Sequence, residues 1–170
     1  LISALKDHWQ IHHDLPTLAN FETDEQINHW DHSFAKPTLA SLPEFPDNTW
    51  LKVRFLPARY AQVNLINFYR DWQDYQYFSF SIYNPNDTLS KLHLKIFDKA
   101  HVTNHYQYQD RYSKPFLINP GINNIRVPIE VIKTSPQNRL MELTDIASVS
   151  LFLSRVEQPS LLYFDDFKLE

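Results

Sequence analysis

One stretch of this sequence concentrates side chains that could bind a ligand. From Lys99 to Ser113 the chain is polar and aromatic without regular periodicity, and irregular segments of this length are often functional. The Arg111 guanidinium offers a planar fork suited to carboxylates or paired hydroxyls. The alternative is a loop fixed by its own contact between Asp110 and Arg111. The stretch and its flanks supply these candidate ligand-binding residues: Asp98, His101, Tyr106, Asp110, Arg111 and Tyr112.

A second set of candidates lies on predicted strands in which aromatic and polar residues alternate with apolar ones. In the stretch Tyr75–Asn84, one side of the predicted strand carries Phe78, Phe80 and Ile82, and the other side carries Tyr77, Ser79, Ser81 and Tyr83. Rings of this kind pack on the apolar face of a pyranose while polar groups hydrogen-bond its hydroxyls. The alternative is a second hydrophobic layer covered by loops or by the N-terminal helix. We predict one shared outward face that contains Tyr77, Tyr83, His93, Lys95, Phe97, Arg126 and Phe152.

The pair Asp71 and Trp72 stands in a predicted loop directly before the strand Tyr75–Asn84. From there the two side chains reach either the core or a ligand, so both join the candidate ligand-binding residues. No nucleophile elbow and no marked pair of glycosidase carboxylates is visible, and a catalytic role is therefore not predicted.

The two ends of the chain carry the candidate metal ligands. Glu22 lies on the first predicted strand and Asp165 on the last, and these strands can be neighbours in a jelly roll. Asp165 shares parity with Phe167, which predicts that it points inward, and a buried carboxylate needs a partner. Calcium accepts carboxylate and carbonyl oxygens in flexible geometry, so Glu22 and Asp165 are its candidate ligands. The alternative is that Asp165 caps backbone amides or pairs with a Lys or Arg.

Composition excludes several classes of protein. The chain has 170 residues, 43% of them hydrophobic, which fits one domain with a packed core. A formal net charge of -4 without a basic stripe argues against a nucleic-acid partner. No cysteine is present, which removes disulfides and thiol chemistry, and a single glycine rules out a P-loop or a dinucleotide fingerprint.

The elements that must position these residues are mostly short strands joined by short turns. We predict an all-β jelly-roll β-sandwich of two antiparallel sheets over residues 18–170, preceded by a helix and linker over residues 1–17. Asn119-Pro120-Gly121 has the signature of a type II turn, and Ile129–Lys133 could form one helical turn. The predicted strands are Leu18–Glu22, Lys36–Leu42, Thr49–Phe55, Ala61–Ile66, Tyr75–Asn84, Lys91–Asp98, Lys114–Ile118, Asn123–Pro128, Ile146–Arg155 and Leu161–Leu169.

Several short motifs follow one another in an order that resembles a carbohydrate-binding-module β-sandwich of the galactose-binding-like type, over roughly residues 18–170. Those motifs are Phe21-Glu22, Asp71-Trp72-Gln73-Asp74-Tyr75, Tyr83-Asn84-Pro85, Asn119-Pro120-Gly121-Ile122-Asn123, Ile125-Arg126-Val127-Pro128 and Leu162-Tyr163-Phe164-Asp165-Asp166-Phe167. A narrower resemblance is to the sandwich domain that follows the membrane-spanning part of some VanZ-like bacterial proteins. The stretches that carry it are Asp98 to His101, Tyr108-Gln109-Asp110-Arg111-Tyr112 and Pro136-Gln137-Asn138-Arg139.

The resemblance implies non-catalytic glycan binding and a structural calcium near Glu22 and Asp165. It also implies an extracytoplasmic position, periplasmic or at the cell surface, beside a membrane-spanning segment upstream in a longer bacterial protein. The expected function is therefore a monomeric carbohydrate-binding module that is not an enzyme. The alternative is a structural or protein-interaction sandwich that binds no sugar.

Overall fold

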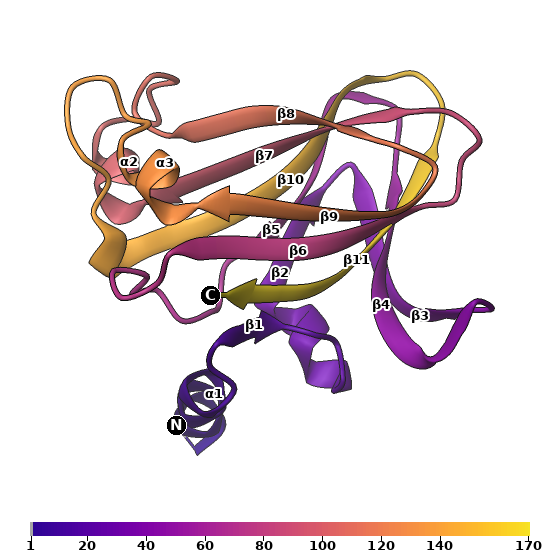
Figure 1. Cartoon of the computed structure of the whole chain (residues 1–170), viewed down its shortest axis with the longest axis horizontal. Coiled ribbons are helices and arrows are strands. Elements are labelled where there is room, and N and C mark those ends of the chain that lie inside the picture. The colour runs from indigo at the N-terminus through magenta and orange to yellow at the C-terminus, as the bar shows by residue number, and fades with distance from the viewer. Residues whose placement is uncertain (1) are drawn as a thin grey trace.

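The computed structural model describes residues 2–170 and confirms an all-β sandwich of two antiparallel sheets stacked as two layers (Figure 1). Each sheet buries one apolar face against the other, which is what stabilises such a pair. Sheet A runs in the order β3 (Ala35–Leu42), β4 (Phe45–Phe55), β11 (Ser160–Leu169), β6 (Tyr77–Asn84) and β9 (Gly121–Pro128), with β1 (Thr17–Ala19) paired to β11. Sheet B runs in the order β2 (Trp30–Ser33), β5 (Ala58–Leu65), β10 (Ile146–Val156), β7 (Ser90–Asp98) and β8 (Tyr112–Ile118).

The helices are short and lie at the margins of the sandwich. They are α1 (Ile2–His13), η1 (Asp24–His29), α2 (Lys99–Thr103), α3 (Ile129–Lys133) and η2 (Leu143–Asp145). Figure 1 shows α1 outside the two layers near β1, and α2 and α3 together at one end of the sandwich. The helical turn predicted at Ile129–Lys133 is confirmed as α3. Helix α2 lies in the stretch predicted to be irregular and begins where the Asp98 carboxylate accepts a hydrogen bond from the His101 N–H at 3.0 Å.

The core lies between the sheets and follows the alternation of the strands. On β6 the side chains of Phe78, Phe80 and Ile82 are buried, as predicted, and every second residue of the neighbouring strands joins them. The inward residues of sheet B are Ala61, Val63, Leu65, Leu92, Leu94, Ile96, Val149, Leu151 and Leu153. The same alternation therefore leaves the intervening residues of sheet B on its outer face.

Three local features differ from the expectation or sharpen it. Strand β2 was not predicted, because four residues are too few to establish a period of two. Gly121 has φ +89°, which confirms that the turn needs the left-handed backbone glycine adopts most easily. In β11 the register shifts between Asp165 and Lys168, and Asp166 takes φ +55° at this bulge. The bulge reverses the predicted parity of Asp165 relative to Phe167.

Candidate functional site

Cross-strand register gathers chemically diverse side chains on the outer face of sheet B. One row places Gln62 beside Phe152 and Phe152 beside His93, and the next row places Ser150 beside Lys95. Residues directly opposite each other in an antiparallel ladder share a face, so these side chains project together. A cleft of about 800 Å³ opens over them, within the range of ligand sites. Its lining is Ser33, Arg59, Tyr60, Gln62, Lys91, His93, Lys95, Tyr108, Arg111, Ser113, Phe152, Ser154 and Arg155.

Aromatic rings form the apolar part of this cleft. The rings of His93 and Phe152 stack with centroids 4.8 Å apart and planes 11° apart, and Tyr60 meets Phe152 edge-on at 5.9 Å. Tyr60 and Tyr108 are 51% and 68% exposed. Since large rings are normally withdrawn from water, their exposure beside a stacked pair leaves ring surface available for a ligand.

Cationic side chains lie over these rings. The Lys95 Nζ is 5.7 Å from the Phe97 ring centroid and 5.9 Å from that of Phe152, and the Arg111 Cζ is 4.8 Å from the Tyr108 ring. Both are cation–π distances. Burial lowers the pKa of Lys95, and the nearby Arg111 charge lowers it further. Burial also lowers the pKa of His93, which favours the neutral ring at pH 7.

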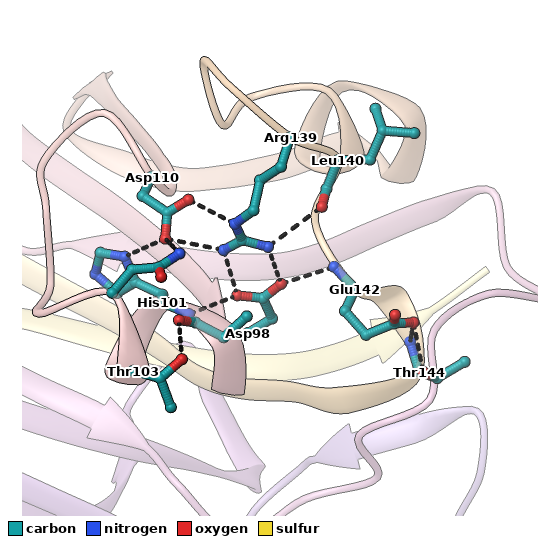
Figure 2. Close-up of polar contacts among 10 residues, drawn as sticks. Asp98, His101, Thr103, Asp110, Arg139, Leu140, Glu142 and Thr144 are labelled. Atoms are coloured by element: carbon teal, nitrogen blue, oxygen red, sulfur yellow. Dashed lines mark hydrogen bonds and ion pairs between the residues drawn. The ribbon is translucent and has the colours of Figure 1, made fainter.

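The loop that carries Tyr108 and Arg111 is held by one buried ion cluster (Figure 2). Arg139 donates to both oxygens of Asp98 at 2.6 and 2.8 Å and to both oxygens of Asp110 at 2.6 and 3.0 Å. Paired N–H donors on a carboxylate fix orientation as well as distance. Because Asp110 directly precedes Arg111, this cluster positions the loop at the rim of the cleft without lining it.

The same cluster sets the protonation state of its carboxylates. Hydrogen bonds from Arg139 lower the pKa of Asp110 to about 2, although burial opposes them. For Asp98, burial acts to raise the pKa, yet hydrogen bonds from Arg139 and from the Glu142 and His101 N–H groups bring it below its ordinary value. Both carboxylates are therefore ionised at neutral pH and occupied by protein donors.

Four predicted ligand-binding residues are core residues instead. Asp98, His101 and Trp72 are 0% exposed and Tyr112 is 2% exposed, so a ligand at the surface does not reach them. Asp98 holds Arg139 and the start of α2. Trp72 stacks on Phe78 at 5.1 Å inside the core. These predictions were wrong because residue type alone does not reveal burial at the end of a strand.

The single outward face predicted for the strands is in fact two faces on opposite sides of the sandwich. Tyr77 and Tyr83 on β6 and Arg126 on β9 belong to sheet A, whereas His93, Lys95, Phe97 and Phe152 belong to sheet B. Arg126 lies 3.5 Å from the Tyr77 ring centroid and donates from Nε to Glu170 at 2.8 Å. The prediction failed because β6 and β7 are consecutive in sequence but enter different sheets.

The remaining predicted residues divide between the cleft and its surroundings. His93 and Arg111 line the cleft together with Lys95 and Phe152, and Asp110 supports it from behind. Tyr106 is 56% exposed and packs edge-on to Phe97 at 6.1 Å, outside the lining. Asp71 also lies outside and accepts hydrogen bonds from Gln73.

Sequence reasoning did not select several lining residues. Tyr60 and Gln62 alternate with the buried residues of β5, but the strand was predicted to start at Ala61, three residues after its true start at Ala58. Had the alternation been followed from Ala61 toward the N-terminus, Tyr60 would have been predicted to face outward beside Gln62. Tyr108 was visible in the sequence as part of the irregular stretch. The other lining residues without a prediction were Ser33, Arg59, Lys91, Ser113, Ser154 and Arg155.

The candidate metal ligands lie on the other sheet. Asp165 pairs with Ser81 of β6 and so projects from the outer side of sheet A, which corrects the prediction that it points into the core. It is nevertheless only 7% exposed. Its Oδ2 accepts from the Asn48 amide at 2.7 Å, while its Oδ1 has no hydrogen-bond donor within the described residues. Burial, with the charges of Asp166 and Glu22, raises the pKa of Asp165 to about 6.

Comparison with solved structures shows that several carbohydrate-binding modules share this β-sandwich fold. The chain superposes on the family 11 carbohydrate-binding module of Clostridium thermocellum, which was solved with a β-1,3-1,4-linked tetrasaccharide, at a TM-score of 0.65 and 13% identity, covering 91% of this chain and 94% of that one. A family 28 module specific for non-crystalline cellulose gives 0.59 and 15%, with 92% and 93% covered.

A part of a larger enzyme has the same fold. The chain matches an exo-β-agarase at a TM-score of 0.70 and 14% identity over 91% of its own length, and it spans 24% of that enzyme. No protein-family model and no curated protein sequence matches the chain. Among residues 2–170, none of the helices has the length and apolar character of a membrane span.

Proposed function

We propose that the domain is a non-catalytic carbohydrate-binding module whose ligand lies in the cleft on the outer face of sheet B. The observation that supports this is the combination of exposed Tyr60 and Tyr108 rings, the stacked pair His93 and Phe152, and hydrogen-bonding groups such as Gln62 in one open cleft. Ring faces shield the apolar C–H faces of a sugar, and the polar groups between them take up its hydroxyls.

The composition of the cleft favours binding over hydrolysis. Glycoside hydrolysis in most families uses two Asp or Glu side chains on either side of the scissile bond. Among the described residues that line this cleft, none is Asp or Glu. A cleft that offers rings, amides, hydroxyls and cations can hold a glycan but provides no such pair of carboxylates.

Ring truncation tests the location of the site. We expect Tyr60→Ala and Tyr108→Ala each to weaken binding to a responding glycan about tenfold, since loss of a stacked ring costs about 1 kcal/mol or more. Tyr163→Ala is the matched control, because Tyr163 packs beside Tyr83 on the outer face of sheet A. A glycan array followed by calorimetry provides the measurement. Equal losses for all three variants would contradict the assignment.

One feature favours a second candidate function, a protein-interaction domain. Helix α1 buries none of its residues, and Ile2, Leu5 and Trp9 are 85%, 63% and 60% exposed along one side of it. Apolar surface of this kind suits an apolar protein partner. This alternative predicts no response on a glycan array and a partner whose capture is lost in Trp9→Ser, whereas sugar binding is indifferent to that change.

We also propose that Asp165 and Glu22 contribute ligands to a structural calcium. The buried, unpartnered Oδ1 of Asp165 fits this ion, which accepts carboxylate, amide and backbone carbonyl oxygens. No group of three or more Asp, Glu or His side chains suited to a metal occurs among residues 2–170, so backbone carbonyls or water would complete the coordination. The bound ion would offset the charge that burial makes costly at Asp165.

Finally, we propose that the domain works outside the cytoplasm of a bacterium as a monomer, tethered through a membrane-spanning segment of a longer VanZ-like protein. The resemblance in the order of the short motifs supports this placement. Reporter fusions to the full-length gene product test it: alkaline phosphatase fused after Glu170 should be active, and an inactive fusion would contradict the proposal. Light scattering of the isolated domain should give the monomer mass.

A further inference from the structure

The cleft on sheet B is strongly cationic in a chain that is acidic as a whole. Five of the 16 Lys and Arg residues line it, and no Asp or Glu does, although the formal net charge of the chain is -4. Positive charge is therefore concentrated in the cleft, while the rest of the chain carries the excess of negative charge. The cationic residues are Arg59, Lys91, Lys95, Arg111 and Arg155.

These cations also have no ion-pair partner in the part of the protein that the structure describes. None of the five forms an ion pair with a carboxylate within residues 2–170, whereas Arg70, Arg126 and Arg139 do. The Nε of Arg111 is buried without any hydrogen-bond acceptor. The guanidinium as a whole lines the cleft beside the Tyr108 ring, so an anionic ligand there would supply the counter-charge that the described residues do not provide.

Two carboxylates, Asp31 and Asp110, belong to the same sheet face or to the loop beside it, and neither forms an ion pair with these cations. Asp31 belongs to the same sheet face, and its charge acts to raise the pKa of Lys95 against the larger effect of burial, but it forms no ion pair with Lys95 and does not line the cleft. It lies opposite Asn64 and accepts a hydrogen bond from the Asn64 amide. Asp110 directly precedes Arg111, but Arg139 donates to both of its oxygens. Three of the cations, Arg59, Lys95 and Arg111, are instead held over aromatic rings. Such contacts orient a cation without neutralising it.

We propose that the ligand of this cleft is an anionic polysaccharide, whose carboxylate or sulfate groups pair with the unpartnered cations while its sugar rings pack on the aromatic side chains. The inference rests on the proposed function and names its ligand class. On the outer face of β7 the His93 ring stands between Lys91 and Lys95, so one saccharide chain can meet both a ring and cations there. A uniformly charged nucleic acid fits less well, because the rest of the acidic protein repels it.

Polymers that share a backbone and differ in charge provide the test. Native affinity electrophoresis is run with three pairs: carboxymethylcellulose and hydroxyethylcellulose, polygalacturonate and its methyl ester, and carrageenan and its desulfated form. We expect at least one anionic member to bind about tenfold or more tightly than its neutral partner, with the difference shrinking as salt is raised. The polygalacturonate and carrageenan pairs show whether carboxylate or sulfate is recognised.

Matched variants connect that preference to the cleft. Arg111→Gln and Arg155→Gln should each weaken binding of the anionic polymer about tenfold, because each removes a charged donor. Lys36→Gln and Arg54→Gln make the same charge change at exposed, unpaired positions on sheet A and should change binding less than twofold. Arg155 is exposed, so its variant tests the idea even if Arg111→Gln folds poorly.

Each other outcome has a defined meaning. Neutral members bound as tightly as their anionic partners would overturn the inference and leave the proposed function intact. If none of the six polymers retards the protein, both the inference and the proposed function are contradicted. Equal binding of polyglutamate or of a single-stranded oligonucleotide would overturn the inference by showing a general polyanion site, as would equal losses in the sheet A variants.

Discussion

Replacing Asp165 by Asn isolates the energetic cost of its buried carboxylate. The pKa of Asp165 is raised from 3.8 to about 6, and the residue is 7% exposed, so solvent screening reduces the effect little. A difference of this size corresponds to about 3 kcal/mol between the two protonation states. Because the folded-state pKa is the higher one, the protonated form favours folding, and this stability is fully present below pH 4 and lost as pH rises through about 6.

We therefore expect Asp165→Asn to raise the free energy of unfolding at pH 7.5 in chelator by up to about 3 kcal/mol. For a chain of this length that is roughly 6–12 °C in melting temperature. At pH 4 the variant and the wild type should unfold together. Thermal melts monitored by circular dichroism between pH 4 and 7.5 provide the comparison, and the difference between the two proteins removes the contribution of every other titrating group.

Calcium should reverse the order at pH 7.5. An ion at one thousand times its dissociation constant stabilises the folded state by about 4.1 kcal/mol, which exceeds the roughly 3 kcal/mol advantage of the variant, and only the protein with the carboxylate gains this fully. Asp87→Asn, at an exposed turn position, is the matched control and should follow the wild type throughout. The reasoning is refuted if wild type and Asp165→Asn show the same pH profile in chelator. Calcium that leaves the wild-type melting temperature unchanged would refute the metal proposal separately.

Three further predictions concern the scaffold of the site. Arg139→Met should destabilise the protein by about 3–5 kcal/mol in urea titrations, because it leaves Asp98 buried without its partner. The control Arg70→Met breaks an exposed ion pair and should cost less than about 1 kcal/mol. Equal losses of stability in the two variants would contradict this reasoning. The folded-state pKa of Asp110 is the lower one, so the wild type should lose at most about 2 kcal/mol of unfolding free energy as pH falls from about 4 through 2. Asp110→Asn should not show this loss. An acid profile that is the same in the variant and the wild type would show that Arg139 does not hold Asp110 ionised. Gly121→Ala should cost about 1 kcal/mol through backbone strain alone, as nothing lies within 4 Å of the added Cβ, and a larger loss would indicate a steric clash.

The positions of most strands were predictable from the sequence because alternation reports a local property. A residue either joins the core or faces outward, and neighbours in a strand take opposite sides. That rule identified Phe78, Phe80 and Ile82 on β6 and the inward residues of β7 without any knowledge of strand order. The need for glycine at position 121 was equally local, since one backbone conformation explains it.

Which outward residues meet was decided only by the tertiary structure. Strand order places β7 beside β10 and β6 beside β9, so Lys95 joins Phe152 on one side of the sandwich and Tyr77 joins Arg126 on the other. Alternation gives each strand an inside and an outside but does not say which sheet the strand enters.

The same limit applies to single side chains whose role depends on distant partners. Asp98 and Arg139 are 41 residues apart, and only the fold joins this candidate ligand-binding residue to the arginine in an ion pair that positions the loop of Arg111. At Asp165 one extra residue in the bulge moved the carboxylate to the other face of its sheet. Sequence therefore determined the elements and their inward faces, whereas the pairing of strands determined the site, because long-range register is a property of the packed chain and not of any segment within it.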